Sequence, residues 1–591
     1  MKQLVLMGLV LGGMLLIGTN LWAKPKGDPE TIRHLTTGSV VGSITKSGHH
    51  LWQGIPYAEP PVGPLRWKSP KPVASWDGVL KATKPSPYCI QYTGATIGRL
   101  KAIAGEVSGH EDCLYLNVWS RPDRRSEGLR PVMFWIHGGG HSVGESKNYK
   151  GDKLLEDHDV VLVTVNYRLG PLGWFRHEAL AEKADDKRER SGNFAVLDLI
   201  QALEWVRDHI AKFGGDPQNV TIFGESAGGS NVMALMASPL ASGLFHRGIS
   251  QSGFVRWVTP DVAEKSKDQG GHEASSFEVI NRLLIADGNA INREEATRRQ
   301  KTMSGVEIEA YLRGLSAETL LKAYQAQFAG MISMPSQFRD GVVLPDLPAE
   351  QAFRQGQFNQ VPIILGTNRD ETKLFMMADP EYVEFKWGVL PTVKDSTYYH
   401  LSAHYGDAYW KVSQVDQMAD AMVASGHADV FVYRFDWDEE PQLFGLDLGK
   451  LLGASHAFEI PFVFNDPDSF IAPIASYFVY NKDNKPGREF LAHTMSSYWV
   501  RFAHEGNPMA GVSDELGVIW EPWNLEGHEN LIIFDDPRDQ KLGMISHRLT
   551  LQGLKDQLKQ EQGFSSDQQK CRVYLKNFGA DEFYQGQCSD L

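Results

Sequence analysis

Continuous runs of apolar residues predict the buried β-strands of this chain. Such runs fall at residues 132–136, 160–165, 361–366 and 431–435, with polar or turn-forming residues on either side. A strand that is apolar at nearly every position suits a sheet that is covered on both faces, as parallel sheets are. The run at residues 431–435 is expected to be the last strand of the core.

A helical pattern follows Asn193. Apolar residues recur three and four positions apart along one stripe, at Val196, Leu199, Leu203, Val206 and Ile210. The pattern stops at residues 214–217, where two glycines close the helix and a proline prevents its return. Strands and helices alternate in this region, which predicts an α/β fold with a mostly parallel, doubly wound central sheet.

Other stretches are less regular. Residues 111–119 alternate apolar with other residues, as a strand with one exposed face does. Residues 53–67 are rich in proline and turn residues, which excludes a helix. Polar, amphipathic segments between about residues 255 and 340 are expected to form helical insertions that cap the site. The polar tail from about residue 551 is expected to be a surface helix and strap.

The sharpest chemical signal is a Gly-x-Ser-x-Gly pentapeptide at residues 224–228. An apolar strand, residues 220–223, leads into it, and a helical pattern follows at once. At a tight strand-to-helix elbow, glycines before and after the serine avoid collisions with neighbouring elements, and the helix N-terminus favours developing negative charge. A chance string in a chain with 57 glycines is the alternative, but the flanking elements favour Ser226 as the nucleophile.

A triple glycine, residues 138–140, follows the apolar run that ends at Ile136 and the intervening His137. Consecutive glycines are costly in conformational entropy, so a purely structural loop seldom needs them. Backbone N–H groups that converge on an oxyanion do need that freedom. Gly139, Gly140 and Ala227, the residue after the nucleophile, are therefore the expected oxyanion donors, with a flexible surface loop as the alternative.

Composition and charge exclude several classes of protein. The chain has 591 residues, of which 42% are hydrophobic and 22% charged, which suits one large globular α/β domain. The net charge of −14 provides no basic footprint for nucleic acid or an anionic membrane. The absence of His-Glu-x-x-His and paired Cys-x-x-Cys spacings predicts no metal and no cofactor.

The N-terminus resembles an export signal. One early lysine precedes an apolar stretch at residues 4–17, and cleavage is expected after Ala23, leaving one domain at residues 24–591. The apolar stretch is too short for a comfortable membrane span, and an uncleaved anchor is the alternative. The mature protein is expected to be soluble and exported, either secreted or periplasmic, without stable membrane insertion.

The four cysteines fit an oxidising compartment. Pairing neighbours, Cys89 with Cys113 and Cys571 with Cys588, is the simplest of the formally allowed arrangements. Each short loop would stabilise the fold by about 3 kcal/mol. Free buried thiols are the alternative.

Several short motifs occur in order at residues 54–58, 111–117, 138–140, 166–168, 213–217, 223–229 and 251–253. Together, and in this order, they resemble the motifs of the type B carboxylesterases, the cholinesterase-like branch of the α/β hydrolases. The resemblance supports the Cys89–Cys113 bond and implies a buried ion pair between Arg168 and Asp198.

The resemblance also implies the remaining catalytic residues. It places the acid at Glu371, beyond the strand at residues 361–366, with Asp370 as a rival that is more simply structural. Thr372 departs from the family, in which a glycine is usual at this position. The histidine is placed at His456, the position that the family gives its catalytic histidine, which fits the order serine, acid, histidine of this fold. The resemblance thereby favours His456 over the other candidate histidines, His404, His493 and His504.

We therefore expect a serine carboxylester hydrolase that works through an acyl-enzyme, with a small ester and water as its substrates. Glu459 is expected to be a carboxylate that supports the catalytic residues from behind, and Glu225 is expected to tune the site or to serve a structural hydrogen bond. The lack of a tryptophan in residues 90–112, where Tyr92 is the only aromatic, disfavours a choline substrate. His141 after the triple glycine predicts a more polar pocket wall. The alternatives are an amidase or lactonase with the same triad, and a non-catalytic cholinesterase-like binding protein.

Overall fold

The computed structural model describes residues 27–93, 105–122, 128–182, 184, 186–386, 390–443, 445–469, 479–509, 518–536 and 542–588. The expected signal at residues 1–23 lies outside this part. Within these ranges, no helix has both the length and the apolar character that crossing a membrane requires.

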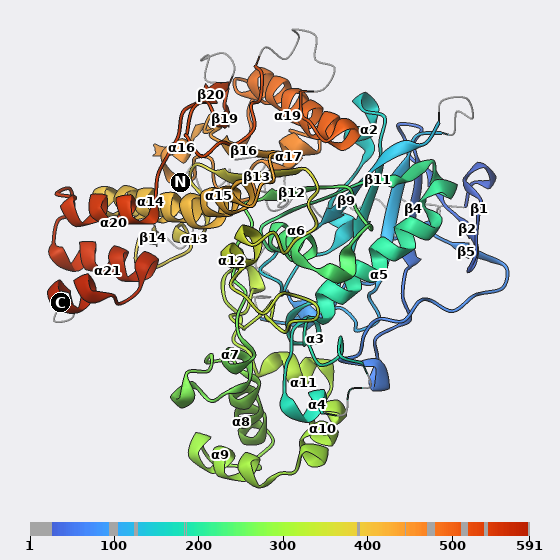
Figure 1. Ribbon diagram of the computed structural model, residues 1–591, viewed down its shortest axis with the longest axis horizontal. Coiled ribbons are helices and arrows are strands. Elements are labelled where there is room, and N and C mark those ends of the chain that lie inside the picture. Colours follow the sequence, from blue (N-terminus) through green and yellow to red (C-terminus); the bar gives the residue numbers. More distant parts are fainter. Residues whose placement is uncertain are drawn as a thin grey trace, which may run out of the picture.

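A large mixed sheet forms the centre of the molecule (Figure 1). Its strands follow the order β20-β19-β16-β13-β12-β11-β9-β10-β8-β4-β3. All neighbours from β19 to β10 are parallel, whereas both edges are antiparallel. The strands are β3 (Ser43–Ile44), β4 (His50–Pro56), β8 (Tyr115–Ser120), β9 (Arg130–Ile136), β10 (Val161–Val165), β11 (Gly215–Glu225), β12 (Arg247–Gln251), β13 (Ile363–Asn368), β16 (Val430–Phe435), β19 (Leu531–Phe534) and β20 (Gly543–Ile545).

The predicted apolar strands are confirmed as β9, β10, β13 and β16. The expectation that residues 431–435 form the last core strand is wrong, because β19 and β20 continue the sheet beyond β16. The apolar run in β19 is only Leu531–Phe534, so it carries little signal in the sequence. The turn-rich segment also contributes its first residues to β4.

Helices cover both faces of the sheet, which explains the continuous apolar runs. Along β9, Val132, Phe134 and Ile136 belong to one hydrophobic core, whereas Met133 and Trp135 belong to the other. The first core includes side chains of α5 (Phe194–His209), α6 (Ala227–Ala237) and α15 (Gln417–Ala424). The second includes side chains of α2 (Asp152–Asp157), α14 (Ser396–Trp410), α17 (Ile460–Val463) and α19 (Lys485–Glu505).

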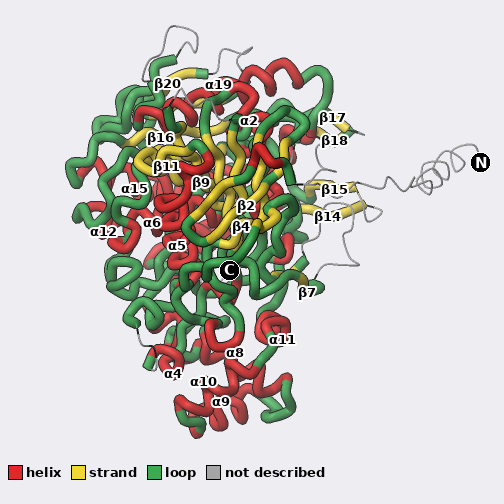
Figure 2. Tube along the Cα trace, turned by 90° about the vertical axis from the view of Figure 1, so that its right-hand side faces the viewer, coloured by secondary structure: helices red, strands yellow, loops and turns green. Residues whose placement is uncertain are grey.

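The expected cap is a cluster of helices at one end of the molecule (Figure 2). Polar side chains fix where several of these helices begin, because Ser275, Asn292, Ser304 and Ser316 each accept a hydrogen bond from a backbone N–H three residues ahead. The helices are α7 (Pro260–Glu264), α8 (Ser276–Ala286), α9 (Arg293–Thr302), α10 (Gly305–Gly314) and α11 (Ala317–Lys322).

Smaller elements complete the described chain. The short strands are β1 (Arg33–Leu35), β2 (Gly38–Val41), β5 (Val79–Lys81), β6 (Gln91–Tyr92), β7 (Val107–Ser108), β14 (Val383–Lys386), β15 (Leu390–Val393), β17 (Gln442–Leu443) and β18 (Leu446–Asp447). The short helices are α3 (Gly170–Gly173), α4 (Glu178–Ala181), α12 (Ala349–Arg354), α13 (Lys373–Met376) and α16 (Leu448–Leu451). A π-helical turn, Lys411–Asp416, joins α14 to α15.

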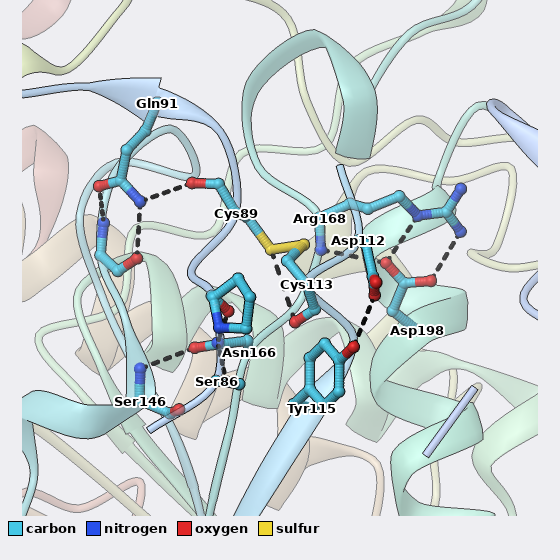
Figure 3. The surroundings of a disulfide bond; sticks show 12 residues. Ser86, Cys89, Gln91, Asp112, Cys113, Tyr115, Ser146, Asn166, Arg168 and Asp198 are labelled. Atoms are coloured by element: carbon cyan, nitrogen blue, oxygen red, sulfur yellow. Dashed lines mark hydrogen bonds and ion pairs between the residues drawn. A yellow bond between two sulfur atoms is a disulfide. The ribbon is translucent and has the colours of Figure 1, made fainter. Parts of the chain in front are cut away.

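Both neighbouring cysteine pairs are bonded, Cys89 to Cys113 and Cys571 to Cys588. Figure 3 shows the first bond beside the ion pair of Arg168 and Asp198. In that pair, Arg168 Nε and Nη2 donate to the two carboxylate oxygens at 2.8 and 2.6 Å, and both side chains are buried. The pairing that the resemblance implied is therefore present.

The tail folds into α20 (Leu551–Gln560), α21 (Asp567–Phe578) and α22 (Glu582–Gln587). It is more than a surface strap, because Leu554, Leu558 and Tyr574 are completely buried in the second core. Its polar composition hides this packing, since each helix uses only a few apolar residues on one side.

Candidate active site

Ser226 lies at the turn between β11 and α6. Its backbone has φ +57° and ψ −122°, a strained conformation outside the helical and extended regions. A Cβ on Gly224 would lie 2.6 Å from the carbonyl oxygen of Ile136, and one on Gly228 would lie 2.0 Å from the same oxygen. The glycines on both sides of the serine are therefore required by close packing, as the pentapeptide predicted.

The triple glycine lies against this elbow. A Cβ on Gly138 would be 3.1 Å from Ser226 Cβ. Gly139 has φ +102° and Gly140 has φ +58°, so both use the left-handed region that glycine allows. Within the described residues, the N–H groups of Gly139 and Gly140 donate no hydrogen bond, and Ala227 begins helix α6. In the described part of the chain, the N–H groups of Gly139 and Gly140 thus remain available to an acceptor from outside the protein.

Glu371 is completely buried just beyond the end of β13. Its carboxylate accepts hydrogen bonds from Thr367 Oγ1 and the Asn368 N–H, both at 2.7 Å, and lies 2.5 Å from His456 Nδ1. Burial acts to raise the pKa of Glu371, but His456 and the hydrogen bond from the Asn368 N–H lower it overall. Glu371 is therefore held as an anion next to the imidazole.

Asp370, the rival acid, has other partners. Its carboxylate lies 2.8 Å from Arg369 Nη2 and 2.8 Å from Lys373 Nζ. It also accepts a hydrogen bond from the Ala454 N–H at 3.1 Å. These contacts give Asp370 a structural role.

His456 is buried between two carboxylates. Its Nδ1 faces Glu371, and its Nε2 lies 3.0 Å from Glu225 Oε1. Burial acts to lower the pKa of His456, but Glu225 and Glu371 raise it to about 9. Burial also raises the pKa of Glu225 to about 8. In the described part of the chain, the Ser226 hydroxyl makes no hydrogen bond, and Glu225 is the group that lies against His456 Nε2.

Glu459 belongs to a buried amide network that sequence reasoning missed. Its carboxylate accepts hydrogen bonds from Asn368 Nδ2 at 2.7 Å and Gln251 Nε2 at 3.1 Å. Asn368 also donates to the carbonyl oxygen of Ser455, the residue before the histidine, at 2.7 Å. Gln251 lies in a motif, residues 251–253, that carries the resemblance. This motif was the signal available in the sequence, but it does not identify the partner of Gln251.

Aromatic rings pack around the histidine, which the sequence did not indicate. The ring centroids of Trp410 and Phe375 lie 5.2 and 5.3 Å from that of His456. Phe254 and Phe328 extend this surface, with centroids 5.4 Å from Trp410 and 5.9 Å from Phe375 respectively. Phe254 is 39% exposed and Phe328 is 37% exposed, so the surface is open to apolar groups.

His141 is buried rather than presented to the pocket. Its Nε2 lies 3.2 Å from the carbonyl oxygen of Ala227, and its Nδ1 lies 3.2 Å from Ser336 Oγ. Its ring centroid is 4.4 Å from that of Trp174. Both ring nitrogens are thus engaged within the protein, so His141 does not supply the polar pocket wall that was expected. No group of side chains suited to a metal ion occurs among the described residues.

Comparison with known proteins identifies the family of this chain. A profile of the Carboxylesterase family matches residues 29–395 and 389–551. The chain is 34% identical to the para-nitrobenzyl esterase of Bacillus subtilis (strain 168) over 536 residues, which cover 85% of this chain and 96% of that protein. It is 31% identical to the acylcarnitine hydrolase of Mus musculus, covering 84% of this chain and 87% of that protein.

Solved structures that resemble this fold are carboxylesterases as well. The crystal structure of a carboxylesterase from Geobacillus stearothermophilus superimposes with a TM-score of 0.63 at 30% identity, covering 86% of this chain and 96% of that chain. The mostly parallel sheet with helices on both faces is thus the α/β-hydrolase fold. Members of this family hydrolyse carboxylic esters with water. The chain belongs to the carboxylesterase family.

Proposed function

We propose that this chain cleaves carboxylic esters through an acyl-enzyme on Ser226, with His456 as the base and Glu371 as its orienting acid. The observation that carries the proposal is the buried imidazole of His456, whose Nδ1 lies 2.5 Å from Glu371 and whose Nε2 lies 3.0 Å from Glu225, the residue before Ser226. Glu371 fixes the tautomer and stabilises the imidazolium.

The reaction has two stages. Ser226 Oγ attacks the ester carbonyl carbon while its proton passes to His456 Nε2. The N–H groups of Gly139, Gly140 and Ala227 stabilise the resulting oxyanion. As the carbon–oxygen bond to the alcohol breaks, the imidazolium gives its proton to the leaving oxygen. Water then attacks the acyl-enzyme by the same route, which releases the acid and restores the Ser226 hydroxyl.

Glu225 competes with Ser226 for the imidazole. A negative carboxylate 3.0 Å from His456 Nε2 stabilises the protonated ring, whereas the reaction needs the neutral ring. Glu225 therefore sets the pH at which the base becomes available. Glu459 supports the ring indirectly, through Asn368 and the carbonyl oxygen of Ser455.

Replacing Glu225 with glutamine should let the enzyme retain kcat/KM to lower pH. Removing the charge lowers the pKa of His456 from its raised value, so the ring stays neutral further into acid. The measurement is the pH profile of kcat/KM with a short-chain p-nitrophenyl ester. Glu264→Gln is the matched control, since Glu264 is a cap carboxylate paired with Arg176, and its profile should match the wild type. If the pH profile of kcat/KM for Glu225→Gln fell in acid at the same pH as that of the wild type, Glu225 would not control the pKa of His456.

The aromatic surface beside His456 favours an ester with an apolar group. Trp410, Phe375, Phe254 and Phe328 provide rings but no charge, and burying an apolar group against them is favourable. The name para-nitrobenzyl esterase, carried by a relative, describes a substrate with such a group. We therefore place a general carboxylester with an apolar acyl or alcohol group in this site.

The test is a comparison of matched ester and amide substrates. A p-nitrophenyl ester should give a rapid burst of p-nitrophenol close to one per active chain, followed by slower steady turnover, because p-nitrophenol leaves during acylation and we expect water attack on the acyl-enzyme to be the slower step. The corresponding p-nitroanilide should turn over much more slowly. Faster cleavage of the anilide or of a lactone would favour the alternative activities, and a folded protein that cleaves none of them would contradict the proposal.

We also propose that the mature chain, residues 24–591, works in an oxidising compartment outside the cytoplasm. The support is the signal-like sequence at residues 1–23 together with the two disulfides. N-terminal sequencing of the exported protein should find Lys24 as the first residue, and retention of Met1 would contradict the assignment.

A further inference from the structure

We propose that the C-terminal helices α20 to α22 hold helix α14 against the catalytic residues, and that Asp407 on α14 is the positioning residue through which they act on Glu371. This inference rests on the function proposed above. It concerns elements to which the catalytic reaction itself assigns no role.

The tail forms hydrogen bonds at two points along or beside α14. Gln569 Nε2 on α21 donates to Asp395 Oδ2 at 3.1 Å, while Asp395 Oδ1 accepts from the Tyr398 N–H at 3.0 Å as the N-cap of α14. Further along the helix, Tyr405 donates its hydroxyl to Glu561 Oε2 at 3.1 Å. The start and the later part of α14 are thus both tied to the tail.

Aromatic contacts fill the space between these points. Phe564 lies 6.4 Å from both Tyr398 and Tyr405, centroid to centroid, and Phe578 lies 5.6 Å from Tyr409. Figure 1 shows α20 and α21 beside α14, on the side of the molecule away from β9. The tail therefore packs along α14 as well as bonding to its start.

The tail lies beyond the family profile, which ends at residue 551, where α20 begins. The Cys571–Cys588 bond links α21 to the end of α22, so this segment has its own covalent closure. A closed, core-packed segment can act as a rigid support.

A residue of α14, Asp407, contacts the residue next to the triad acid. Asp407 Oδ1 accepts hydrogen bonds from the Thr372 N–H and the Thr372 hydroxyl, both at 2.7 Å. Asp407 is 7% exposed, and Thr372 is the residue immediately after Glu371. A Cβ on Gly406 would lie 3.0 Å from Thr372 Cγ2, so the helix backbone also approaches closely. This threonine stands where the family usually has glycine, and its hydroxyl gives Asp407 a contact that glycine would lack.

The same helix also touches the base. Trp410, the last residue of α14, lies 5.2 Å from the His456 ring. One rigid element thus contacts the neighbour of the acid and packs on the histidine. A shift of about 1 Å in such groups can cost about a hundredfold in rate, because proton transfer depends on their alignment. Loss of the support should lower kcat more than it raises KM.

The first test separates positioning from charge at Asp407. Asp407→Ala removes both hydrogen bonds to Thr372 and should lower kcat about tenfold or more, within the loss expected for a misaligned group, with KM within about twofold. Asp407→Asn keeps an oxygen acceptor and should restore most of the rate. Thr372→Val loses only the hydroxyl contact and should fall between them. Equal losses in the alanine and asparagine variants, or a loss confined to KM, would overturn the role.

The second test asks whether the tail acts through this contact. Gln569→Ala, and separately Cys571→Ser combined with Cys588→Ser, should lower kcat in the full chain. Because both changes act through α14, their effects should be less than additive with Asp407→Ala in a double-mutant cycle. Leu575→Ala is the matched control on α21, since this side chain is 40% exposed, and its kcat should equal the wild type.

The outcomes are distinguishable. Lower thermal stability with unchanged kcat in the tail variants would overturn the inference and leave the tail a purely structural addition. If Asp407→Ala fails to fold, Thr372→Val and Gln569→Ala still decide, because each removes one polar contact and little packing. A folded wild type that cleaves no ester would contradict the proposed function itself. An active wild type with unaffected variants would defeat only this inference.

Discussion

Replacing Ser226 with alanine should lower kcat for a short-chain p-nitrophenyl ester by about a millionfold, the loss typical of removing a serine nucleophile. The variant has no oxygen that can form the acyl-enzyme, although binding and the oxyanion donors remain. Alanine fits the elbow because it removes only a hydroxyl that has no hydrogen bond in the described structure, so the fold should be retained. Steady-state kinetics and thermal unfolding measure the two effects.

The matched control is Ser242→Ala, which changes an exposed serine beyond the end of α6. Its kcat should equal that of the wild type. A Ser226→Ala variant that folds and keeps even a hundredth of the wild-type kcat would show that another group performs the attack.

Replacing Glu371 with glutamine should lower kcat by about four orders of magnitude, as the corresponding change does in serine protease triads. The amide keeps the size of the carboxylate but loses its charge, which stabilises the imidazolium. It also no longer secures the tautomer with hydrogen on Nδ1. The contact at 2.5 Å to His456 and the completely buried position leave water little chance to replace the carboxylate.

Asp370→Asn is the control for this prediction, because it alters the neighbouring carboxylate. Asp370 pairs with Arg369 and Lys373, so its loss should lower the melting temperature while kcat falls far less than in Glu371→Gln. A larger loss of kcat in Asp370→Asn would reverse the assignment of the triad acid.

The sequence predicts those parts of the fold whose signal is local. Strands such as β9 and β10 are buried on both faces, and the resulting apolar runs are unmistakable. The edge strands β19 and β20 are too short for such a signal, because only their pairing with β16 and with each other makes them part of the sheet. The packing of the polar tail likewise depends on a surface, α14, that is distant in sequence.

The same distinction applies to the site. Ser226 and its flanking glycines were predicted from the residues, because the strained elbow is built within one short segment. Glu371 and His456 were placed only by resemblance, since they come from separate loops and no local pattern joins them. The approach of Glu225 to His456 and the packing of Trp410 are consequences of tertiary structure alone.

The most direct measurement of the central claim is labelling of the mature protein by a fluorophosphonate, with peptide mass mapping and parallel ester assays. This reagent captures the nucleophile of a serine hydrolase, because it mimics the tetrahedral stage that the oxyanion donors stabilise. The account predicts a single adduct on the peptide that contains Ser226, formed in step with the loss of esterase activity. A folded, active enzyme that is not labelled, or that is labelled at another residue, would contradict it.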